Sequence, residues 1–293
     1  MTFKEKYEKI KQLGQIELNI IEKNMVSDIN IREPLKSCLK GFLSLPSKRI
    51  RPLLAILYTK ACEKTLTEEQ INVLTVIELI HNASLIHDDI IDNSDFRREH
   101  KTLNNEFDNK LAVISGDYIL ALAMEKLTEI NNIDIIKKIS QTIKQMCLGE
   151  INQNFDRFKI TTIDEYIEKT KNKTAYLFEC TLVCNAMLSS TNVNLKEISE
   201  LGLEIGIAFQ IRDDLLNLSQ TDNSKPTNND IKEGIYNAPI IFAQNTDNYA
   251  TGIEKTKVLL NNYVQSAKQK IENLPNNKYK EALAEFLELL NNV

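Results

Sequence analysis

Apolar side chains recur every three to four residues along most of the chain, which is the period of an amphipathic α-helix. Glycine and proline, which interrupt helices, occur only 8 and 6 times. Helices are therefore expected near residues 3–25, 31–44, 50–64, 68–93, 110–130, 133–157, 163–189, 195–218, 231–247, 251–273 and 277–291. The pattern predicts an all-α bundle of about 10 to 13 helices.

Capping signals support three of these helix starts. In each, Thr or Asn stands three residues ahead of Glu or Gln, just before an apolar-periodic stretch. The pairs are Thr67 with Gln70, Thr162 with Glu165, and Asn194 with Glu197. The one long polar stretch is "NLSQTDNSKPTNNDIKEG" at 217–234, which has few apolar anchors and predicts a mobile loop. Because no other segment resembles a linker, we expect a single domain over residues 1–293.

Charge, hydropathy and cysteine spacing argue against several classes of protein. The net charge of −5 argues against a general electrostatic grip on nucleic acid. The start "MTFKEKYEKIKQLG" lacks an apolar signal core, and no run of about 18 apolar residues occurs, so we expect a cytoplasmic protein without an integral membrane segment. The five cysteines show no CxxC spacing, which favours neither disulfides nor zinc. Cys180 and Cys184 share a helix face and are interpreted as core packing.

The stretch "LIHDDIIDNSDFRREH", residues 85–100, places several aspartates at the end of an apolar helix. On a helix, Asp88 and Asp92 lie about 40° apart, and Asp95, if the helix reaches it, lies about 20° from Asp88 on the other side. Unpaired carboxylates are costly to desolvate. The cluster is therefore either a hydrated surface or the holder of something strongly positive.

A second copy of this arrangement favours cation binding. A shift of 125 residues aligns "NASLIHDDIID" (82–92) with "IAFQIRDDLLN" (207–217), which pairs Asp88 with Asp213 and Asp89 with Asp214. Two such helix ends can face one another across a bundle. Carboxylates supplied sparsely from two helices suit Mg²⁺, whose coordination is usually completed by water and phosphate oxygens. The sequence thus predicts a phosphorylated substrate.

Cationic side chains for such a substrate are also present. The segment "PSKRIRP" places Lys48, Arg49 and Arg51 beside a helix start, where free N–H groups already favour anions. The other candidates are Arg97, Arg98, Lys173 and Lys225. No GxxxxGKS/T loop occurs, so a P-loop nucleotide site is excluded.

All three histidines, His81, His87 and His100, fall in the same region. His81 and His87 are six residues apart, about 240° around a helix, so they cannot chelate one ion together. We interpret His81 as a hydrogen-bond donor to a substrate phosphate. For His87, a purely structural role is the alternative.

Several motifs, in order, resemble those of the trans-isoprenyl diphosphate synthases, and in particular the longer-chain polyprenyl type. They are "SKRIRP" for GKRxRP, "HDDIID" for the first DDxxD, "RRE" for RRG, "GDY" at 116–118, "GE" followed by Gln153, "KTAYLF" at 173–178, "FQIRDDLLN" for the second aspartate motif, and "SKPTNNDIKEG" for GKxxxxDLxEG. The resemblance covers roughly residues 40–240. It implies the isoprenoid synthase fold, a single all-α bundle around a deep central cavity, usually as a homodimer.

The resemblance also implies a reaction and a role for each candidate residue. The enzyme would condense isopentenyl diphosphate with an allylic diphosphate. Asp88, Asp92 and Asp213 would bind about three Mg²⁺ ions with substrate present, while Asp89 and Asp214 would orient metal-bound waters. Lys48, Arg51, His81 and Arg98 would hold the diphosphate of isopentenyl diphosphate, and Arg97, Lys173 and Lys225 that of the allylic substrate. Thr174 and Gln210 would present oxygens to the developing allylic cation.

The sequence also departs from the family pattern. Asn217 replaces the last aspartate of the second motif, and Ile235 stands where many members have lysine. Glycine is usual at the positions of Ser47, Glu99 and Ser224. Two alternatives follow: a non-catalytic or regulatory subunit that needs a partner chain, and a class I terpene cyclase. The intact aspartates and cations oppose the first, and the basic set at 48–51 opposes the second.

Small residues before the first aspartate motif predict a long product. Ala83 and Ser84 lie about 7.5 and 6 Å deeper than Asp88 along the helix. By the resemblance, short-product enzymes tend to carry aromatic rings at these positions, so the product is expected to grow past the geranylgeranyl stage. The cavity would then end near Ile143, Met146 or Cys147. The alternative is that Ala83 and Ser84 are small only because two helices pack closely there.

Overall fold

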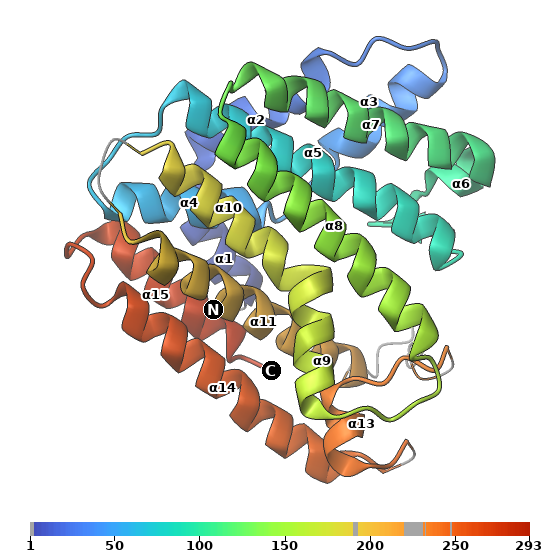
Figure 1. Ribbon diagram of the computed structural model, residues 1–293, viewed down its shortest axis with the longest axis vertical. Coiled ribbons are helices and arrows are strands. Elements are labelled where there is room, and N and C mark those ends of the chain that lie inside the picture. Colours follow the sequence, from blue (N-terminus) through green and yellow to red (C-terminus); the bar gives the residue numbers. More distant parts are fainter. Residues whose placement is uncertain (1–2, 190–192, 220–230, 232, 247) are drawn as a thin grey trace.

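The computed structural model describes residues 3–189, 193–219, 231, 233–246 and 248–293. Its architecture is a bundle of α-helices, which confirms the predicted fold class (Figure 1). The only strands among the described residues form a two-stranded antiparallel hairpin, β1 (Phe96–Arg97) and β2 (His100–Lys101), which the helical period did not predict. None of the described helices is both long and apolar enough to cross a membrane.

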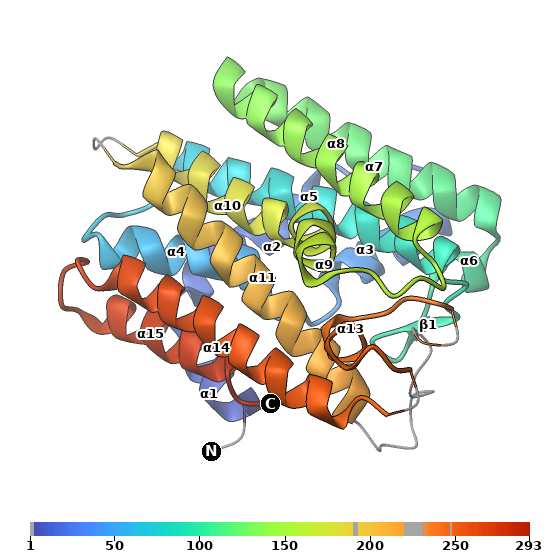
Figure 2. The same ribbon diagram turned by 60° about the horizontal axis from the view of Figure 1, so that its bottom comes forward.

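The helices follow one another along the chain. Their bounds are α1 (Phe3–Gln12), α2 (Gln15–Ser27), α3 (Leu35–Ser44), α4 (Ile50–Ala61), α5 (Glu68–Ile91), α6 (Leu103–Glu106), α7 (Asn109–Glu129), α8 (Ile133–Phe155), α9 (Ile163–Thr170), the π-helical turn η1 (Lys171–Ala175), α10 (Tyr176–Met187), α11 (Leu195–Ser219), α13 (Ala238–Ala243), α14 (Ala250–Ile271) and α15 (Lys278–Leu290). Figure 2 shows α7 and α8 along one edge of the bundle and α14 with α15 along the other.

The predicted caps are present. Thr67 and Thr162 each form a complete capping box, in which the hydroxyl accepts from the backbone three residues on and the Gln70 or Glu165 side chain accepts from the cap backbone. The Asn194 side chain accepts a hydrogen bond from the backbone of Lys196. These local contacts fix where α5, α9 and α11 begin.

Two predicted helices differ from the structure. The helix expected over 3–25 is two helices, because the chain turns at Leu13 and Gly14, where glycine disfavours helix continuation. The helix expected over 231–247 was also wrong as one continuous helix, since residues 233–237 are not helical and α13 begins at Ala238. Gly234 has a φ of 75°, and Asn237 with Pro239 marks the later start of α13.

The helix expected over 163–189 contains the π-helical turn η1. A Cβ on Gly149 of α8 would lie 2.9 Å from the backbone nitrogen of Lys173, and a Cβ on Gly206 of α11 would lie 2.5 Å from Cα of Ala175. Glycine at both positions therefore lets the wider turn approach α8 and α11 closely. The turn carries Lys173 and Thr174 into the space between these helices, which the regular helical period does not predict.

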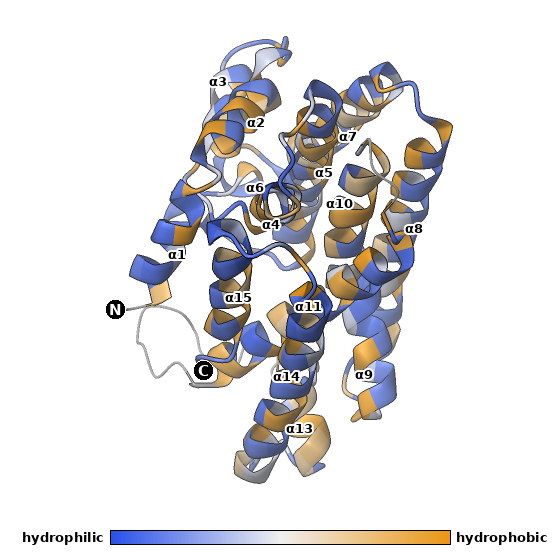
Figure 3. Cartoon of the chain, turned by 90° about the vertical axis from the view of Figure 1, so that its left-hand side faces the viewer, coloured by the Kyte–Doolittle hydropathy of each residue, from blue (hydrophilic) through white to orange (hydrophobic). Residues whose placement is uncertain are grey.

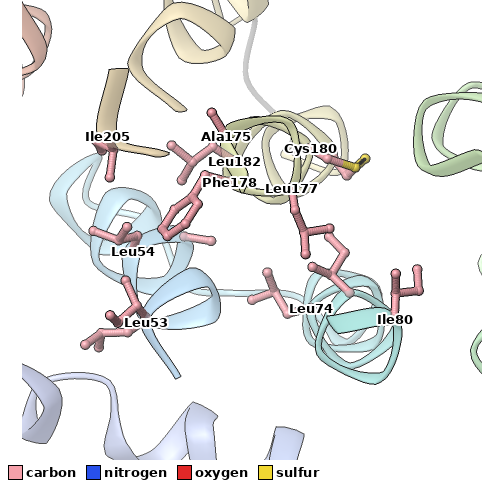
Figure 4. Close-up of a cluster of buried hydrophobic side chains, with 14 of the residues drawn as sticks. Leu53, Leu54, Leu74, Ile80, Ala175, Leu177, Phe178, Cys180, Leu182 and Ile205 are labelled. Carbon is pink, nitrogen blue, oxygen red and sulfur yellow. Dashed lines mark hydrogen bonds between the residues drawn. The ribbon is translucent and has the colours of Figure 1, made fainter. Parts of the chain in front are cut away.

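The core lies between α4, α5, α10 and α11. Leu54, Leu74, Phe178 and Ile205, one from each helix, are all buried and lie close together in Figure 4. Figure 3 shows polar residues gathering on the outward faces of the helices. Helix α5 packs against α2, α4, α7 and α10, and α11 packs against α10, α14 and η1. Both acidic helices are thus anchored in the core, and their C-terminal ends open on the same side of the molecule (Figure 1).

Candidate active site

A pocket of about 310 Å³ lies between the C-terminal ends of α5 and α11. Of the predicted site residues, it is lined by Asp92, Lys173, Thr174, Gln210, Asp213 and Asp214. Asn217 and Ile235, the two departures noted in the sequence, also line it. The two aspartate motifs, 125 residues apart in sequence, therefore meet at one opening.

The α5 carboxylates are crowded and partly withdrawn from water. Burial raises the pKa of Asp88 to about 6, against the lowering effect of nearby Lys173. The pKa of Asp92 is raised for the same reason. Helix α5 ends at Ile91, so Asp92 occupies the cap position and Asp95 lies beyond the helix, not on the predicted face. This corrects the conditional placement of Asp95 in the cluster.

Asp89 is held by the hairpin. It is buried and accepts hydrogen bonds from Nε of Arg97 at 2.8 and 2.9 Å, while Nη2 of Arg97 lies 2.7 Å from Oδ1. Arg98 and Glu99 turn the chain between β1 and β2 with φ values of 51° and 67°. The hairpin therefore fixes Arg97 against Asp89, and it explains why glycine suits position 99.

On α11, a chain of hydrogen bonds orders the buried residues behind Asp213. The Tyr166 hydroxyl donates to Oδ2 of Asp214 at 2.6 Å, and the Gln210 amide donates to Oδ1 at 2.9 Å. The Thr174 hydroxyl donates to Oε1 of Gln210 at 2.7 Å. These bonds fix the orientation of the Gln210 amide and commit the Thr174 proton, which leaves hydroxyl oxygen lone pairs at the pocket wall. Burial raises the pKa of Asp214 to about 7, against the lowering effect of its two hydrogen bonds.

Lys173 stands opposite, paired with Glu150 of α8 at 2.8 Å. Burial lowers the pKa of Lys173, but attraction to Glu150, Asp88 and Asp92 outweighs that effect and leaves the pKa above its ordinary value. Lys173 is therefore firmly charged beside the α5 carboxylates. A bound anion would compete with Glu150 for it.

A second group of cations lies around α4 and α5. The Arg51 guanidinium lies 4.6 Å from the centre of the Phe178 ring, and its buried Nε has no hydrogen-bond partner among the described residues. Burial lowers the pKa of Arg51 to about 10, partly offset by Glu78. Burial is the main reason that the pKa of His81 lies well below its ordinary value, and the positive charges of Arg51 and Arg98 lower it further. His81 is thus neutral at pH 7 and keeps one N–H to donate, as predicted for a phosphate contact.

Neighbouring residues with similar chemistry have structural partners instead. Arg49 is buried and contacts Glu22 at 3.0 Å and Glu78 at 3.2 Å, so it stabilises the fold next to Arg51. His87 lies 3.3 Å from the Val113 carbonyl and belongs to the α5–α7 interface, which supports its structural interpretation. Lys48 is exposed overall, but part of its side chain is covered. This partial burial lowers the pKa of Lys48, and the nearby positive charge of Arg212 lowers it further.

The residues predicted to control product length lie inside the bundle. Ala83 is buried, and Ser84 is half-buried and donates to the His81 carbonyl at 2.8 Å. Ile143 and Met146 of α8 are partly buried against the core. Cys147 is exposed, so its predicted place at the end of an internal cavity was wrong. Cys180 and Cys184 are buried with their sulfurs 3.7 Å apart, as expected for core residues. Lys225, Ser224 and most of the predicted mobile loop lie outside the described residues.

The donor set fits Mg²⁺ only in combination with a ligand. Within the part of the chain that the structure describes, no three acidic, histidine or cysteine side chains converge closely enough to hold an ion by themselves. Asp92 and Asp213 nevertheless line one pocket from two helices, and burial disfavours the ionised form of Asp88 and Asp92. Such a site suits a cation that brings water and phosphate oxygens with it.

Several residues in and beside the pocket were not assigned a role from the sequence. Tyr166 and Lys169 line the pocket from α9, and Glu150 pairs with Lys173 from α8. Tyr166 and Lys169 precede Lys173 by seven and four residues, which is the spacing of one helix face. That spacing could have indicated that Tyr166 and Lys169 belong to the site, but the same spacing is typical of core packing. The position of α9 beside α11 in the structure shows that these residues line the pocket.

Comparison with known proteins agrees with this geometry. Residues 32–279 match the family model described as polyprenyl synthetase. A prenyl transferase of Cyanophora paradoxa is 32% identical over 91% of this chain and 92% of its own length. The solanesyl diphosphate synthase 1 of Arabidopsis thaliana is 36% identical over 79% of this chain and 60% of its own length. The crystal structure of heptaprenyl diphosphate synthase from Staphylococcus aureus superposes with a TM-score of 0.87 at 27% identity, covering 94% of this chain and 97% of that one. The chain therefore belongs to the polyprenyl synthetase family.

Proposed function

We propose that the protein is a Mg²⁺-dependent trans-prenyltransferase that condenses isopentenyl diphosphate with an allylic diphosphate to build a polyprenyl diphosphate longer than the geranylgeranyl stage. The observation that carries the proposal is the pocket that joins Asp92 and Asp213, with Lys173 on its wall. Relatives named as solanesyl and heptaprenyl diphosphate synthases support the long-chain assignment.

The proposed reaction requires that the negative charge of the leaving diphosphate is neutralised and that water is excluded from the allylic cation. The allylic C–O bond breaks and diphosphate leaves with the electron pair. The double bond of isopentenyl diphosphate then forms the new C–C bond, and the departed diphosphate accepts the proton that is lost. Mg²⁺ held by Asp88, Asp92 and Asp213 would neutralise the leaving diphosphate. The apolar core beneath the pocket would keep water from the allylic cation.

The residues of the pocket divide this work. Lys173, paired now with Glu150, would turn to the allylic diphosphate. Arg97, paired now with Asp89, would exchange part of that pairing for the same diphosphate, which Lys225 would also contact. Thr174 and Gln210, ordered by the bond between them, would present oxygen to the developing cation. Asp89 and Asp214 are each held by protein partners and would orient metal-bound water rather than bind the metal directly.

The diphosphate of isopentenyl diphosphate would bind to Lys48, Arg51, His81 and Arg98. The Nε of Arg51, which has no hydrogen-bond partner within the described part of the chain, supports an anion there. The crowding of arginines around His81 supports it too, because a bound anion relieves the repulsion between the arginines. A terpene cyclase would need no second diphosphate site.

The test measures incorporation of labelled isopentenyl diphosphate into acid-labile product, with and without an allylic primer and Mg²⁺. The wild type should require all three components, and chelation of the metal should stop the reaction. Asp88→Asn and Asp213→Asn should each lower turnover by at least about a hundredfold without unfolding the protein. Asp95→Asn, next to the motif but outside helix α5, is the matched control and should stay near wild type.

The outcomes separate the alternatives. Product formed from the allylic diphosphate alone would indicate a cyclase. A folded wild-type protein that incorporates no label with any primer would indicate a regulatory subunit, for which Asn217 and Ile235 in the pocket wall would be the first residues to examine.

A further inference from the structure

Helix α1 lies across the segment that carries Lys48. The Tyr7 hydroxyl donates to the Lys48 carbonyl at 2.5 Å, and Nζ of Lys11 donates to the Ser47 carbonyl at 2.8 Å. The Phe3 ring centre lies 5.2 Å from Nζ of Lys48. Positions 3, 7 and 11 share one helix face, so one side of α1 contacts both the backbone and the charged end of this segment.

The same Phe3 ring also faces a second cation. The Cζ atom of Arg212 lies 4.1 Å from the ring centre. Arg212 is buried on α11, immediately before Asp213, and its Nε has no hydrogen-bond partner among the described residues. Phe3 is therefore the contact between the Lys48 segment and the end of α11 that carries an aspartate of the pocket.

The Phe3 ring contacts two positively charged side chains, Lys48 and Arg212. Lys48 and Arg212 repel one another, whereas the negative face of an aromatic ring attracts both. The ring is itself held in place: it stacks on Tyr7 with centres 6.1 Å apart, and Tyr7 packs against Phe286 of α15 at 6.3 Å. The stack thus keeps a π surface at the point where the two cations meet.

The geometry points to Phe3 as a positioning residue for isopentenyl diphosphate, because its ring holds the Lys48 ammonium at a fixed distance from the α11 end that carries Asp213. This inference rests on the proposed function, in which Lys48 binds that diphosphate. Phe3 itself touches neither substrate. Its effect is expected on the binding of isopentenyl diphosphate and not on that of the allylic primer.

The test compares Phe3→Leu, which keeps apolar volume but loses the π face, with Phe3→Tyr, which keeps the ring. Phe3→Leu should raise KM for isopentenyl diphosphate about two- to fivefold, the range expected of an exposed cation–π contact, and leave KM for the primer unchanged. Phe3→Tyr should restore wild-type KM values. Unchanged KM in Phe3→Leu, or equal increases in both variants, would overturn the inference. Thermal unfolding of each variant checks that α1 still docks.

A second variant does not depend on Phe3. Tyr7→Phe keeps the ring against Phe286 and loses only the hydrogen bond to the Lys48 carbonyl. It should also raise KM for isopentenyl diphosphate without changing KM for the primer. An unchanged KM would contradict the role of α1 in placing Lys48.

Lys48→Gln separates this inference from the proposed function. If Lys48→Gln leaves KM for isopentenyl diphosphate unchanged, the assignment of Lys48 to that substrate is wrong. If Lys48→Gln raises KM and Phe3→Leu does not, only the role of Phe3 is wrong. If both raise it, the double variant should match Lys48→Gln alone, since a ring that acts through Lys48 has no further effect once the ammonium is gone. Additive effects in the double variant would overturn the inference.

Discussion

The residues behind the pocket show how buried polar groups can prepare a site for a ligand. Asp214 is buried with both carboxylate oxygens bonded, one to Tyr166 and one to Gln210, and Gln210 is in turn bonded to Thr174. Buried polar groups are stable only when partnered, so this network specifies one arrangement of side chains along the pocket wall. The arrangement exists before any ligand binds.

Tyr166→Phe tests this network at its buried end. Loss of the hydroxyl removes one hydrogen bond to the buried Asp214 carboxyl group, so we expect kcat to fall about tenfold and the Mg²⁺ concentration for half-maximal activity to rise. Steady-state kinetics with varied Mg²⁺ measures both. Tyr263→Phe, another partly buried tyrosine on α14, is the matched control and should change neither. A Tyr166→Phe enzyme with wild-type metal dependence would show that the hydroxyl serves the fold alone.

The pKa of Asp214 predicts a pH dependence of stability. The folded-state pKa is about 7, whereas the ordinary value is 3.8, so the folded protein holds a proton that the unfolded chain has lost. Stability from this group is therefore greatest at low pH and is lost as pH rises toward 7. The free energy of unfolding of the metal-free wild type should fall relative to Asp214→Asn between about pH 4 and 7, by up to about 1.4 kcal/mol per pH unit.

Denaturant titrations of the two proteins at matched pH give this difference directly. The difference in unfolding free energy between the two proteins cancels the contributions of groups that titrate in both. One such group is His81, whose lowered pKa makes stability rise with pH below pH 6.5, opposite to the effect of Asp214. A constant difference between wild type and Asp214→Asn across this range would contradict a buried, protonated Asp214.

At the scale of elements, the sequence predicted what depends on local pattern. The helical period and the Thr67 and Thr162 caps are local signals, and α5 and α9, which they predict together, are present. The repeated aspartate pattern correctly predicted that α5 and α11 end at one site. The π-helical turn, the hairpin and the partners of Tyr166 were not predictable in this way, because each depends on contacts between distant segments, such as the close approach of Gly206 to Ala175.

Helix α5 also carries the prediction on product length. Ala83 is buried about one and a half turns before Asp88, and Ala83→Phe should place a ring in the path of the growing chain. We expect shorter products while primer consumption continues, measured by sizing the dephosphorylated alcohols. Ser84→Ala, which adds no volume, is the control and should leave the distribution unchanged.

The packing alternative makes a different prediction for the same variant. If Ala83 is small only because helices pack closely, overpacking should reduce folded, soluble Ala83→Phe protein and lower its thermal midpoint. The product distribution of the remaining active enzyme would then match the wild type, and that result would remove Ala83 from the account of chain length.

For the whole molecule, apolar residues remain exposed along α7 and α8, the edge seen at the top of Figure 2. Val113, Ile114, Leu148 and Ile151 are exposed by 40% or more. Exposed apolar patches of this kind mark association surfaces, so we expect a homodimer with a mass of twice the 33.6 kDa of one chain. Light scattering after size exclusion measures it.

Charge placed on this edge should break the dimer. Ile114→Glu combined with Ile151→Glu should give a monomer, because each copy of a two-fold interface would bring the new carboxylates into an apolar contact. Val258→Glu on α14, at a side chain that is 62% exposed, is the matched control and should remain dimeric. A monomeric wild type, or a double variant with an unchanged mass, would place the association surface elsewhere or exclude it.

We propose that this chain alone elongates an allylic diphosphate past the geranylgeranyl stage. The direct measurement incubates the purified protein with Mg²⁺, excess labelled isopentenyl diphosphate and either farnesyl or geranylgeranyl diphosphate, then sizes the dephosphorylated products by chromatography and mass spectrometry. We expect a series of alcohols longer than geranylgeraniol, separated by single isoprene units. Products that stop at or before geranylgeraniol, or that appear only after a second protein is added, would show that the proposed long-chain activity of this chain is wrong.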